Sequence, residues 1–542
     1  MISQITSFAQ RDDLSSRALI AAIIPISFVV VLVFVRSHVG PFWHWYLSDP
    51  TYFYLLDGVN LLNGDTPGHI YHPGITVHAF NAAILGLGNL HFTGNIQDLV
   101  LADPEKYLRL LSNLAIILSA SAIFLIGIIS RSAFGSWLPS ITCQLSPFAS
   151  SIVLKHAFQP KPEAFLVFAT CLLIAGMLCG RGRAPIIPQP RILAVMYGVI
   201  GGFIIATKVT AAPILILPLF LLSGFASRLI FVAVSAIAFI FFFLPAIDAL
   251  SLFFDWLVKL SSTQGSHGGG PSGFVNIDEY TKAFFKILKR PSIKIPLILA
   301  AITIGVAGWR SSQSQSQIQL NTDDMRGIVG ISAAQLAQAV LVAKQAAAFY
   351  MIPAYMLAVM SVLLSLRILW AVRPAKFDNQ VSGHAIGALI VMIFIVGQMN
   401  GIRKVASHFE ALRQHAEELD HRSHPQCARI YNYTSSSPVF ALYLADFVTG
   451  GRQSKAIKNL VPDNHYWIND WWAWKPAELR DWEGKVSFHK IRNEYPCLIF
   501  HGSKRHGAEQ FLKIQEPKLL FQTTCISGSE VIKTVGTSCR LG

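Results

Sequence analysis

The chain has 542 residues, of which 53% are hydrophobic and only 14% are charged, whereas ordinary soluble domains carry about 25% charged residues. Its formal net charge of +14 is spread over loops and forms no basic domain, which argues against a nucleic-acid-binding protein. The composition excludes a string of soluble domains and predicts that most of the chain lies in lipid.

Apolar runs of spanning length recur along the chain and predict a polytopic α-helical membrane protein with about eleven transmembrane helices, since each crossing needs about 20 apolar residues. Eight runs are nearly continuous, at 18–35, 110–129, 164–179, 192–206, 229–246, 295–308, 350–366 and 384–397. Three weaker runs cover 137–153, 211–222 and 328–342. We expect the first run to be retained, because it is too long for a secretory signal.

Lysines and arginines in short loops predict the orientation. They gather at 181–191 and 367–376, and an eleven-span topology places both loops in the cytoplasm. The N-terminus is then cytoplasmic, and the C-terminus lies in the periplasm or lumen, as expected for a protein of a bacterial inner membrane. Two long external loops follow, at 37–108 and 248–293. The second is itself basic, but long loops are translocated largely regardless of charge.

The pattern changes near residue 401, which predicts a transmembrane domain over 1–400 and a small soluble α/β domain over 401–542. Strands are expected at 429–433, 485–491, 498–501 and 519–524, and helices at 402–419, 438–447 and 508–514. Four cysteines there form either two disulfides, with three possible pairings, or unpaired buried thiols. They are Cys427, Cys497, Cys525 and Cys539. Five tryptophans between 467 and 482 either build a core or contact sugars or lipid.

The first external loop begins with a carboxylate, Asp49, at the mouth of the first helix. An amphipathic helix at 51–62 is expected to end at the C-cap Gly64, and a second apolar stretch covers 75–87. We expect both helices to lie on the membrane surface. Asp49 is placed to take a proton from an acceptor hydroxyl, or else it N-caps the helix that starts at Pro50. We expect Asp57 to face water and Asp65 to cap the turn.

This arrangement resembles the GT-C superfamily of membrane glycosyltransferases, which includes protein O-mannosyltransferases and lipid A aminoarabinose transferases. In those families the first external loop starts with an acidic residue, usually in Asp-Glu, and a small-Gly-Asp turn closes the helix that follows. Asp49 and Gly64-Asp65 match these positions, but Pro50 replaces the second acid. Further matching segments are Tyr71-His72-Pro73-Gly74, Glu105 to Leu111, Lys161-Pro162-Glu163, Ala206-Thr207-Lys208, and Lys344 before Tyr350-Met351-Ile352-Pro353.

The resemblance implies transfer of a sugar from a polyprenyl-phosphate donor to a lipid, glycan or protein acceptor on the exoplasmic side, with Asp49 as general base. Cations near the headgroup plane suit the donor phosphate, and the candidates are Lys208, Arg109, Lys161 and Lys344, with Lys155 on the same face. The candidate acceptor or flap residues are His72, His267 and Asp65. No cofactor and no metal site are predicted, because one histidine is too few ligands, although a divalent metal could take part.

Two other functions compete with this one. A transporter or lipid flippase usually places ionisable residues within the bilayer and often contains inverted repeats, and neither feature is found in this sequence. A catalytically inactive GT-C-like scaffold is favoured by Pro50. Each single lysine at the membrane face has the alternative role of snorkelling to the interface.

Overall fold

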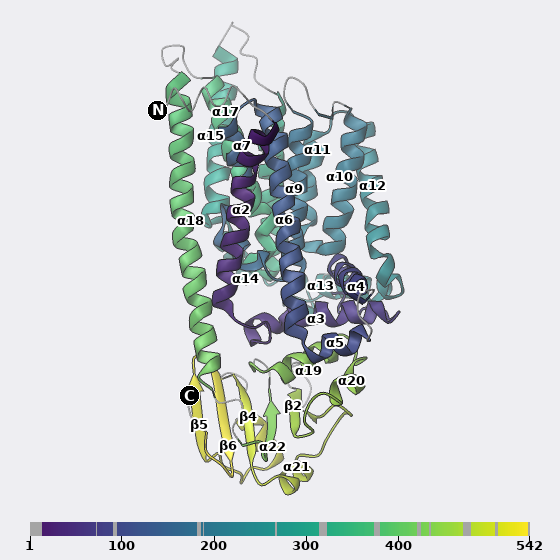
Figure 1. Cartoon of the computed structure of the whole chain (residues 1–542). Helices are drawn as coiled ribbons and strands as arrows, with labels where there is room; N and C mark the ends of the chain where they lie inside the picture. Colours follow the sequence, from purple (N-terminus) through teal and green to yellow (C-terminus); the bar gives the residue numbers. More distant parts are fainter. Residues whose placement is uncertain are drawn as a thin grey trace. The chain divides into compact units, whose positions relative to one another are not determined.

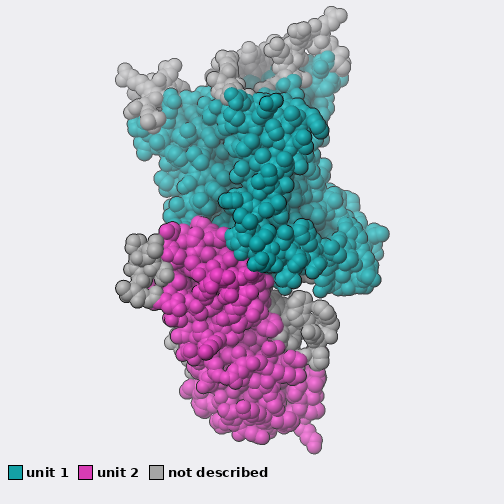
Figure 2. Space-filling model, turned by 90° about the vertical axis from the view of Figure 1, so that its right-hand side faces the viewer, with its two compact units in different colours: residues 1–34, 70–77, 112–403 teal, residues 35–69, 78–111, 404–542 magenta. Residues whose placement is uncertain are grey.

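The structure is a computed structural model that describes most of the chain. The described residues are 14–71, 73–89, 95–181, 186–187, 189–265, 268–313, 322–372, 380–419, 424–432, 435–469, 478–503 and 508–539. Contacts between Cα atoms divide the chain into two compact units, coloured in Figure 2. Unit 1 comprises Met1–Phe34, Ile70–Val77 and Ser112–Arg403, and unit 2 comprises Val35–His69, His78–Leu111 and Lys404–Gly542. Unit 2 thus joins the C-terminal residues with two segments of the predicted first external loop, and the domain boundary at residue 400 stays a prediction.

Long apolar helices dominate unit 1 (Figure 1). Eight segments of the described residues are long and apolar enough to cross a membrane by length and composition: Ser15–Val39, Pro104–Phe134, Pro162–Cys179, Pro190–Thr207, Phe225–Ser262, Pro291–Ser311, Thr322–Gln345 and Ala348–Ala371. They coincide with eight of the eleven predicted spans. Large apolar side chains such as Ile23, Val232 and Ile302 are more than half exposed, as a surface in contact with lipid requires. The chain is therefore an integral membrane protein.

The helices of these segments are α2 (Leu14–Val39), α6 (Pro104–Phe134), α9 (Pro162–Cys179), α10 (Pro190–Thr207), α12 (Phe225–Phe243), η3 (Leu244–Ala249), α13 (Leu250–Ser262), α15 (Pro291–Gln313), α16 (Thr322–Val342), η5 (Ala343–Gln345), η6 (Ala348–Met351) and α17 (Ile352–Ala371). A further short helix, α14, covers Ile277–Leu288. Within unit 1, α10 packs along α12, and α17 packs along α15 and α16.

The other three predicted spans take different forms, and the count of eleven stays a prediction. Segment 137–153 is broken into α7 (Trp137–Gln144), η1 (Ser146–Ala149) and α8 (Ser151–Ala157). Pro147 lacks the N–H that a continuous helix would use there, and the Ser150 side chain caps the next helix by accepting from Ile152 N. Segment 211–222 forms η2 (Val209–Leu215) and α11 (Ile216–Leu221), and 384–397 is part of the long helix α18 (Gln380–Glu417).

Unit 2 contains a six-stranded sheet in the order β3-β2-β1-β4-β6-β5, whose strands β4, β6 and β5 are seen side by side in Figure 1. Strand β1 is parallel to β2 and β4, and the other pairs are antiparallel. The strands are β1 (Ala428–Tyr431), β2 (His465–Asn469), β3 (Glu478–Arg480), β4 (Leu498–Ser503), β5 (Thr523–Ser527) and β6 (Glu530–Val535). The helices are α3 (Trp45–Leu62), α4 (Ile75–Asn89), which starts in unit 1, α5 (Ile96–Ala102), α19 (Pro438–Val448), α20 (Ser454–Lys458), α21 (Phe488–Glu494) and α22 (Ala508–Gln515). This sheet confirms the predicted C-terminal α/β fold.

One predicted strand of this domain is wrong, and the strand predicted at 519–524 is displaced, because β5 begins only at Thr523. Segment 485–491 forms most of helix α21 instead, because Phe488 and Ile491, three residues apart, bury the same helix face. The predicted helix at 402–419 is the end of α18, which runs on without a break from the apolar segment before it. Strands β2, β3 and β6 were not expected.

The structure decides the alternative that the sequence left open for the four cysteines and, for the tryptophans, decides it at Trp467. Cys427 pairs with Cys497, and Cys525 pairs with Cys539, which confirms the two disulfides. Trp467 is fully buried on β2, and its ring stacks on Tyr443 at 3.4 Å between centroids. This tryptophan therefore belongs to the core, while the predictions for 471–474 lie outside the described residues.

Candidate functional site

Lys208 lies where helix α10 ends in unit 1. Its backbone is extended (φ −163°, ψ 113°) and caps the helix after Thr207. The turn at Pro73-Gly74 packs against this corner: Pro73 forms a β-bridge with Lys208, and Gly74 N–H donates to the carbonyl of Thr207 over 3.2 Å. The hydroxyl oxygens of Thr76 and Thr207 are 2.7 Å apart. Two motifs that the sequence only suggested separately are thus brought together.

The side chain of Lys208 is buried and ion-paired. Its ammonium donates to the Glu163 carboxylate, and the two residues are only 3% and 2% exposed. The same nitrogen lies 4.6 Å from the ring centroid of Tyr350 and 5.2 Å from that of Phe349, within cation–π range. Glu163 occupies the first turn of α9, where the helix dipole favours a carboxylate. Because both charges are buried, they hold each other in a fixed position.

A second cation shares the Phe349 ring. The Lys161 ammonium lies 5.9 Å from its centroid, and the His156 ring lies 5.2 Å from it. Burial, with Lys161 next, holds the pKa of His156 well below its usual value, so this imidazole is neutral. We call Lys161, Glu163, Lys208, Phe349 and Tyr350 the lysine cluster. With two ammonium groups and one carboxylate, it keeps a net positive charge that attracts an anion.

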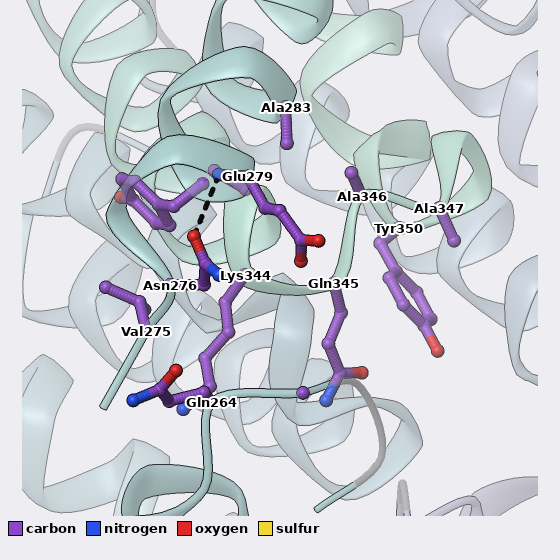
Figure 3. Close-up of a pocket in the computed structure, with 13 residues that line it drawn as sticks. Gln264, Val275, Asn276, Glu279, Ala283, Lys344, Gln345, Ala346, Ala347 and Tyr350 are labelled. Carbon is purple, nitrogen blue, oxygen red and sulfur yellow. Dashed lines mark hydrogen bonds between the residues drawn. The ribbon is translucent and has the colours of Figure 1, made fainter. Parts of the chain in front are cut away.

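Lys344 lies beside a cavity that adjoins this cluster (Figure 3). Its ammonium donates to the carbonyl of Leu260 and lies 4.6 Å from the centroid of Phe274. The cavity has a volume of about 430 Å3, and its lining includes Gln264, Asn276, Glu279, Gln345 and Tyr350. Tyr350 belongs both to the cavity wall and to the lysine cluster. Lys161 and Lys208 therefore lie over the rings of Phe349 and Tyr350, whereas Lys344 lies over Phe274 at the adjoining cavity.

Asp49 is exposed in unit 2, at an interruption of helix α3. The helix begins at Trp45, earlier than predicted, and Asp49 has non-helical angles (φ −97°, ψ 115°) before it resumes. This extended backbone is that of an N-cap, so the roles of cap and base both stay predictions. The predicted end of the helix is confirmed, because Gly64 has a positive φ of 80° and Asp65 N–H donates to the carbonyl of Asn60 over 2.9 Å.

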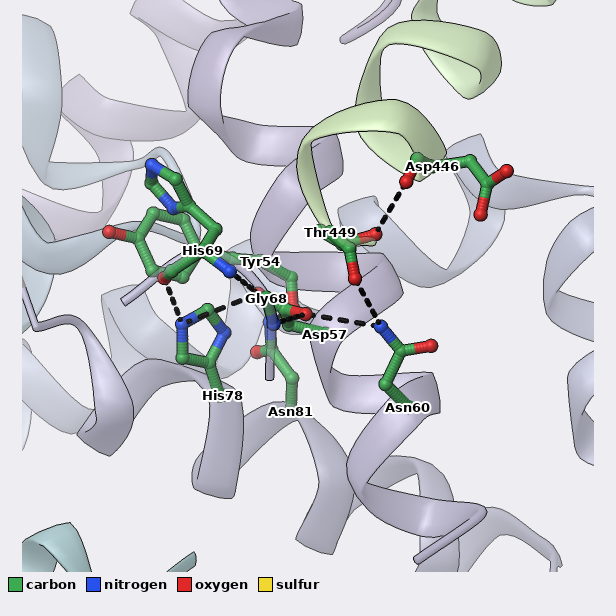
Figure 4. Close-up of polar contacts among 9 residues, drawn as sticks. All are labelled: Tyr54, Asp57, Asn60, Gly68, His69, His78, Asn81, Asp446 and Thr449. Atoms are coloured by element: carbon green, nitrogen blue, oxygen red, sulfur yellow. Dashed lines mark hydrogen bonds and ion pairs between the residues drawn. The ribbon is translucent and has the colours of Figure 1, made fainter. Parts of the chain in front are cut away.

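Asp57 is fully buried, and the expectation that it faces water is wrong (Figure 4). Its carboxylate accepts hydrogen bonds from Gly68 N at 2.8 Å, His69 N at 2.9 Å and Asn60 Nδ2 at 3.1 Å. Burial raises the pKa of Asp57 to about 7. His78 Nε2 lies 3.7 Å from the carboxylate and donates to the carbonyl of His69 over 3.0 Å, and burial lowers the pKa of His78 to about 3.

The network continues into the C-terminal part of unit 2. Asn60 Nδ2 also approaches the carbonyl of Thr449 at 3.4 Å, and Gln453 Nε2 donates to Asn60 Oδ1 over 2.7 Å. The Asp446 carboxylate accepts from the backbone N–H of Gln453 over 2.7 Å. Buried amides and carboxylates thus fix helix α3 to helices α19 and α20. Sequence reasoning missed this network, because its partners are almost 400 residues apart.

Glu105 holds the start of the first external loop. Its carboxylate accepts from the backbone N–H groups of Phe42 and Trp43 and from the Tyr52 hydroxyl, each over 2.9 Å. The sequence drew attention to this residue only as part of a matching segment, and the structure gives it the role of fixing the backbone before α3.

The remaining candidates are distributed as follows. Arg109 is exposed on α6 and belongs to unit 2, together with Asp49 and the exposed Asp65, so their proximity to the lysine cluster stays a prediction. His72 and His267 lie outside the described residues. Within the described ranges, no group of three or more His, Cys, Asp and Glu side chains could hold a metal ion.

No protein-family model and no curated protein matches the chain. Among solved structures, the chain is similar to the crystal structure of ArnT from Cupriavidus metallidurans bound to undecaprenyl phosphate. The similarity covers 94% of this chain and 97% of that chain, with 12% sequence identity and a TM-score of 0.43. At this level the similarity carries no argument about function, which therefore rests on the residues of the chain itself.

Proposed function

We propose that the protein is a membrane glycosyltransferase that moves a sugar from a polyprenyl-phosphate donor to an acceptor on the exoplasmic side. The observation that carries this proposal is the lysine cluster, where spanning helices end and two ammonium groups lie beside a polar cavity. Charge-assisted hydrogen bonds to phosphate are the use to which such cations are best suited near a membrane face. The acceptor class is a lipid, a glycan or a protein.

The chemistry of transfer requires stabilisation of the phosphate that leaves the sugar. Negative charge grows on this phosphate in the transition state, and preorganised cations lower its energy most effectively. Lys208 is preorganised by its ion pair with Glu163 and by the Tyr350 ring. The adjoining cavity of about 430 Å3 is within the size range of small-molecule sites, and its amide and carboxylate side chains suit sugar hydroxyls.

Asp49 is the proposed general base. An acceptor hydroxyl has a high pKa, so a carboxylate takes its proton only as the new C–O bond forms. Asp49 is exposed, so an acceptor can reach it, whereas Asp57 is fully buried and its carboxylate accepts hydrogen bonds from Gly68, His69 and Asn60. Asp57 is therefore the poorer candidate.

The proposed location is a bacterial inner membrane, with a cytoplasmic N-terminus and an exported C-terminal domain. The two disulfides of that domain support this orientation, because such bonds persist in oxidising compartments. A reporter fused after Gly542 should behave as exported. Cytoplasmic reporter activity would contradict the orientation and the exoplasmic reaction with it.

The lipid that co-purifies with the full-length protein tests the donor class. Mass spectrometry of extracts should detect a polyprenyl phosphate or its glycoside, and sugar transfer from that lipid should follow when acceptors are supplied. A protein that neither retains nor binds a polyprenyl phosphate would refute the proposal. Binding without any transfer would favour an inactive scaffold, the alternative that Pro50 supports.

A further inference from the structure

Helix α14 carries a basic face that the proposed reaction does not use. Lys282, Lys286 and Lys289 are exposed, and their spacing of four and three residues places them on one side of the helix. Arg290 follows directly and is half-buried. No hydrogen bond or ion pair joins the side chains of these four residues to another described residue.

Large apolar side chains are exposed on the same segment. Phe274 is 67% exposed, Ile277 is 73% exposed and Phe285 is 54% exposed. Cations near the end of a helix also complement its dipole, but that role does not explain exposed phenylalanines. Apolar side chains and lysines that are exposed together on one segment suit contact with the interface of an anionic membrane.

An apolar groove of unit 1 begins where this basic segment ends. Its volume is about 580 Å3, and α15, α17 and α18 contribute to its walls. The lining includes Ala149, Ile295, Ala358, Val359, Ile393 and Gly397. Arg290 is the one charged side chain among the described residues that line it. Because α15 and α17 belong to candidate membrane spans, a lipid chain is the apolar group that can reach this groove.

We propose that this groove binds one anionic glycerophospholipid, with its phosphate on Arg290 and an acyl chain between α15, α17 and α18. The guanidinium forms no hydrogen bond or ion pair with another described residue, and a phosphate can accept two of its hydrogen bonds in parallel. A zwitterionic headgroup would bring its own cation close to Lys286 and Lys289, which repel it. The site shares no residue with the lysine cluster or with the cavity beside Lys344, and it does not depend on the proposed reaction.

Two substitutions separate the phosphate contact from the groove. Arg290→Gln removes the charge and keeps a hydrogen-bonding side chain. Gly397→Leu fills the groove, and a Cβ at Gly397 meets no atom within 4 Å, so the helix accepts it without a clash. Gly305→Leu is the matched control, since Gly305 lies on α15 outside the groove and also meets nothing within 4 Å. Lys490→Gln, on α21, removes one charge far from the groove in sequence.

The test is native mass spectrometry of full-length protein in detergent, titrated with phosphatidylglycerol or phosphatidylcholine of identical acyl chains. Wild type should bind one phosphatidylglycerol and should prefer it to phosphatidylcholine, because Lys286 and Lys289 repel the choline group. Arg290→Gln should weaken the binding of both lipids by about tenfold or more, the effect expected when one charge-assisted contact to phosphate is lost, and Gly397→Leu should also weaken both. Both control variants should bind phosphatidylglycerol as wild type does.

Three outcomes would overturn the assignment. Equal wild-type affinity for the two phospholipids would remove the anionic preference. Unchanged phosphatidylglycerol binding in Arg290→Gln or Gly397→Leu would place the lipid elsewhere. If a polyprenyl phosphate displaced phosphatidylglycerol and lost its affinity in the same two variants, the groove would belong to the donor. None of these results depends on sugar transfer, so the fate of the proposed reaction is decided separately.

Discussion

Removal of the Lys208 charge should affect donor binding and stability in ways that a double-mutant cycle can separate. Lys208 and Glu163 are 3% and 2% exposed and form an ion pair. Lys208→Gln alone leaves a buried carboxylate without its partner, which costs about 3–5 kcal/mol. The double variant Lys208→Gln/Glu163→Gln lacks both charges, so it should regain most of the stability that the single variant loses. Thermal unfolding in detergent measures this difference.

In the double variant, donor binding should stay weak even though the stability of the fold is regained. Loss of one charge-assisted contact to phosphate costs about 1.5–3 kcal/mol, or about a ten- to hundredfold weaker Kd, in the single and the double variant alike. Titration calorimetry with a polyprenyl phosphate measures this change. The exposed pair of Lys458 and Glu483 is the control, and the same cycle there should leave binding unchanged and stability nearly so. Wild-type affinity in the double variant would refute the role of Lys208 in phosphate binding.

Further predictions concern single groups of unit 2. Burial raises the pKa of Asp57 to about 7, so the folded protein keeps a proton that the unfolded chain loses near pH 4. The contribution of Asp57 to the free energy of unfolding should therefore be largest below pH 4 and fall up to pH 7, at about 1.4 kcal/mol for each unit of pKa difference. The unfolding temperature of Asp57→Asn should lack this slope, and an identical slope would contradict the assignment. Replacement of Cys427 and Cys497 by alanine removes the disulfide between residues 70 apart and should destabilise the C-terminal domain by about 4 kcal/mol. Denaturant unfolding measures this loss, and an unchanged unfolding curve would show that the disulfide is dispensable. Asp49→Asn keeps the capping ability of the residue but should lower the rate of sugar transfer by about 10²–10⁴, and a near wild-type rate would place the base elsewhere.

The spans were predictable because a membrane helix depends on local composition. Segments such as 164–179 and 350–366 need only their own apolar residues to be recognised, and both coincide with helices of the structure. Segment 137–153 was predicted less well. Its average hydrophobicity suggested one continuous helix, but Pro147 interrupts that helix. In the C-terminal domain, Phe488 and Ile491 fit a strand and a helix equally well until the core they contact is known.

The sequence predicted which lysines belong to the candidate site, but it did not predict the residues that these lysines contact. Lys208 was found from its turn, but its ion pair with Glu163 bridges 45 residues, and no sequence periodicity indicates such a contact. No feature of the sequence indicated a role for Phe349, although two ammonium groups lie over its ring. Asp57 was assigned to the polar face of an amphipathic helix, and the turn at Gly68 and His69 that covers it could not be foreseen.

Tyr350 lines the polar cavity and also lies against the Lys208 ammonium. A change in the size or electronic character of this ring therefore alters both places at once. Under the proposed function, substitutions of Tyr350 should therefore change sugar preference and phosphate affinity together. If the proposed function is used as a guide for engineering, Glu279 and Gln345 are the better positions at which to change sugar preference alone, because they line the cavity and lie outside the lysine cluster.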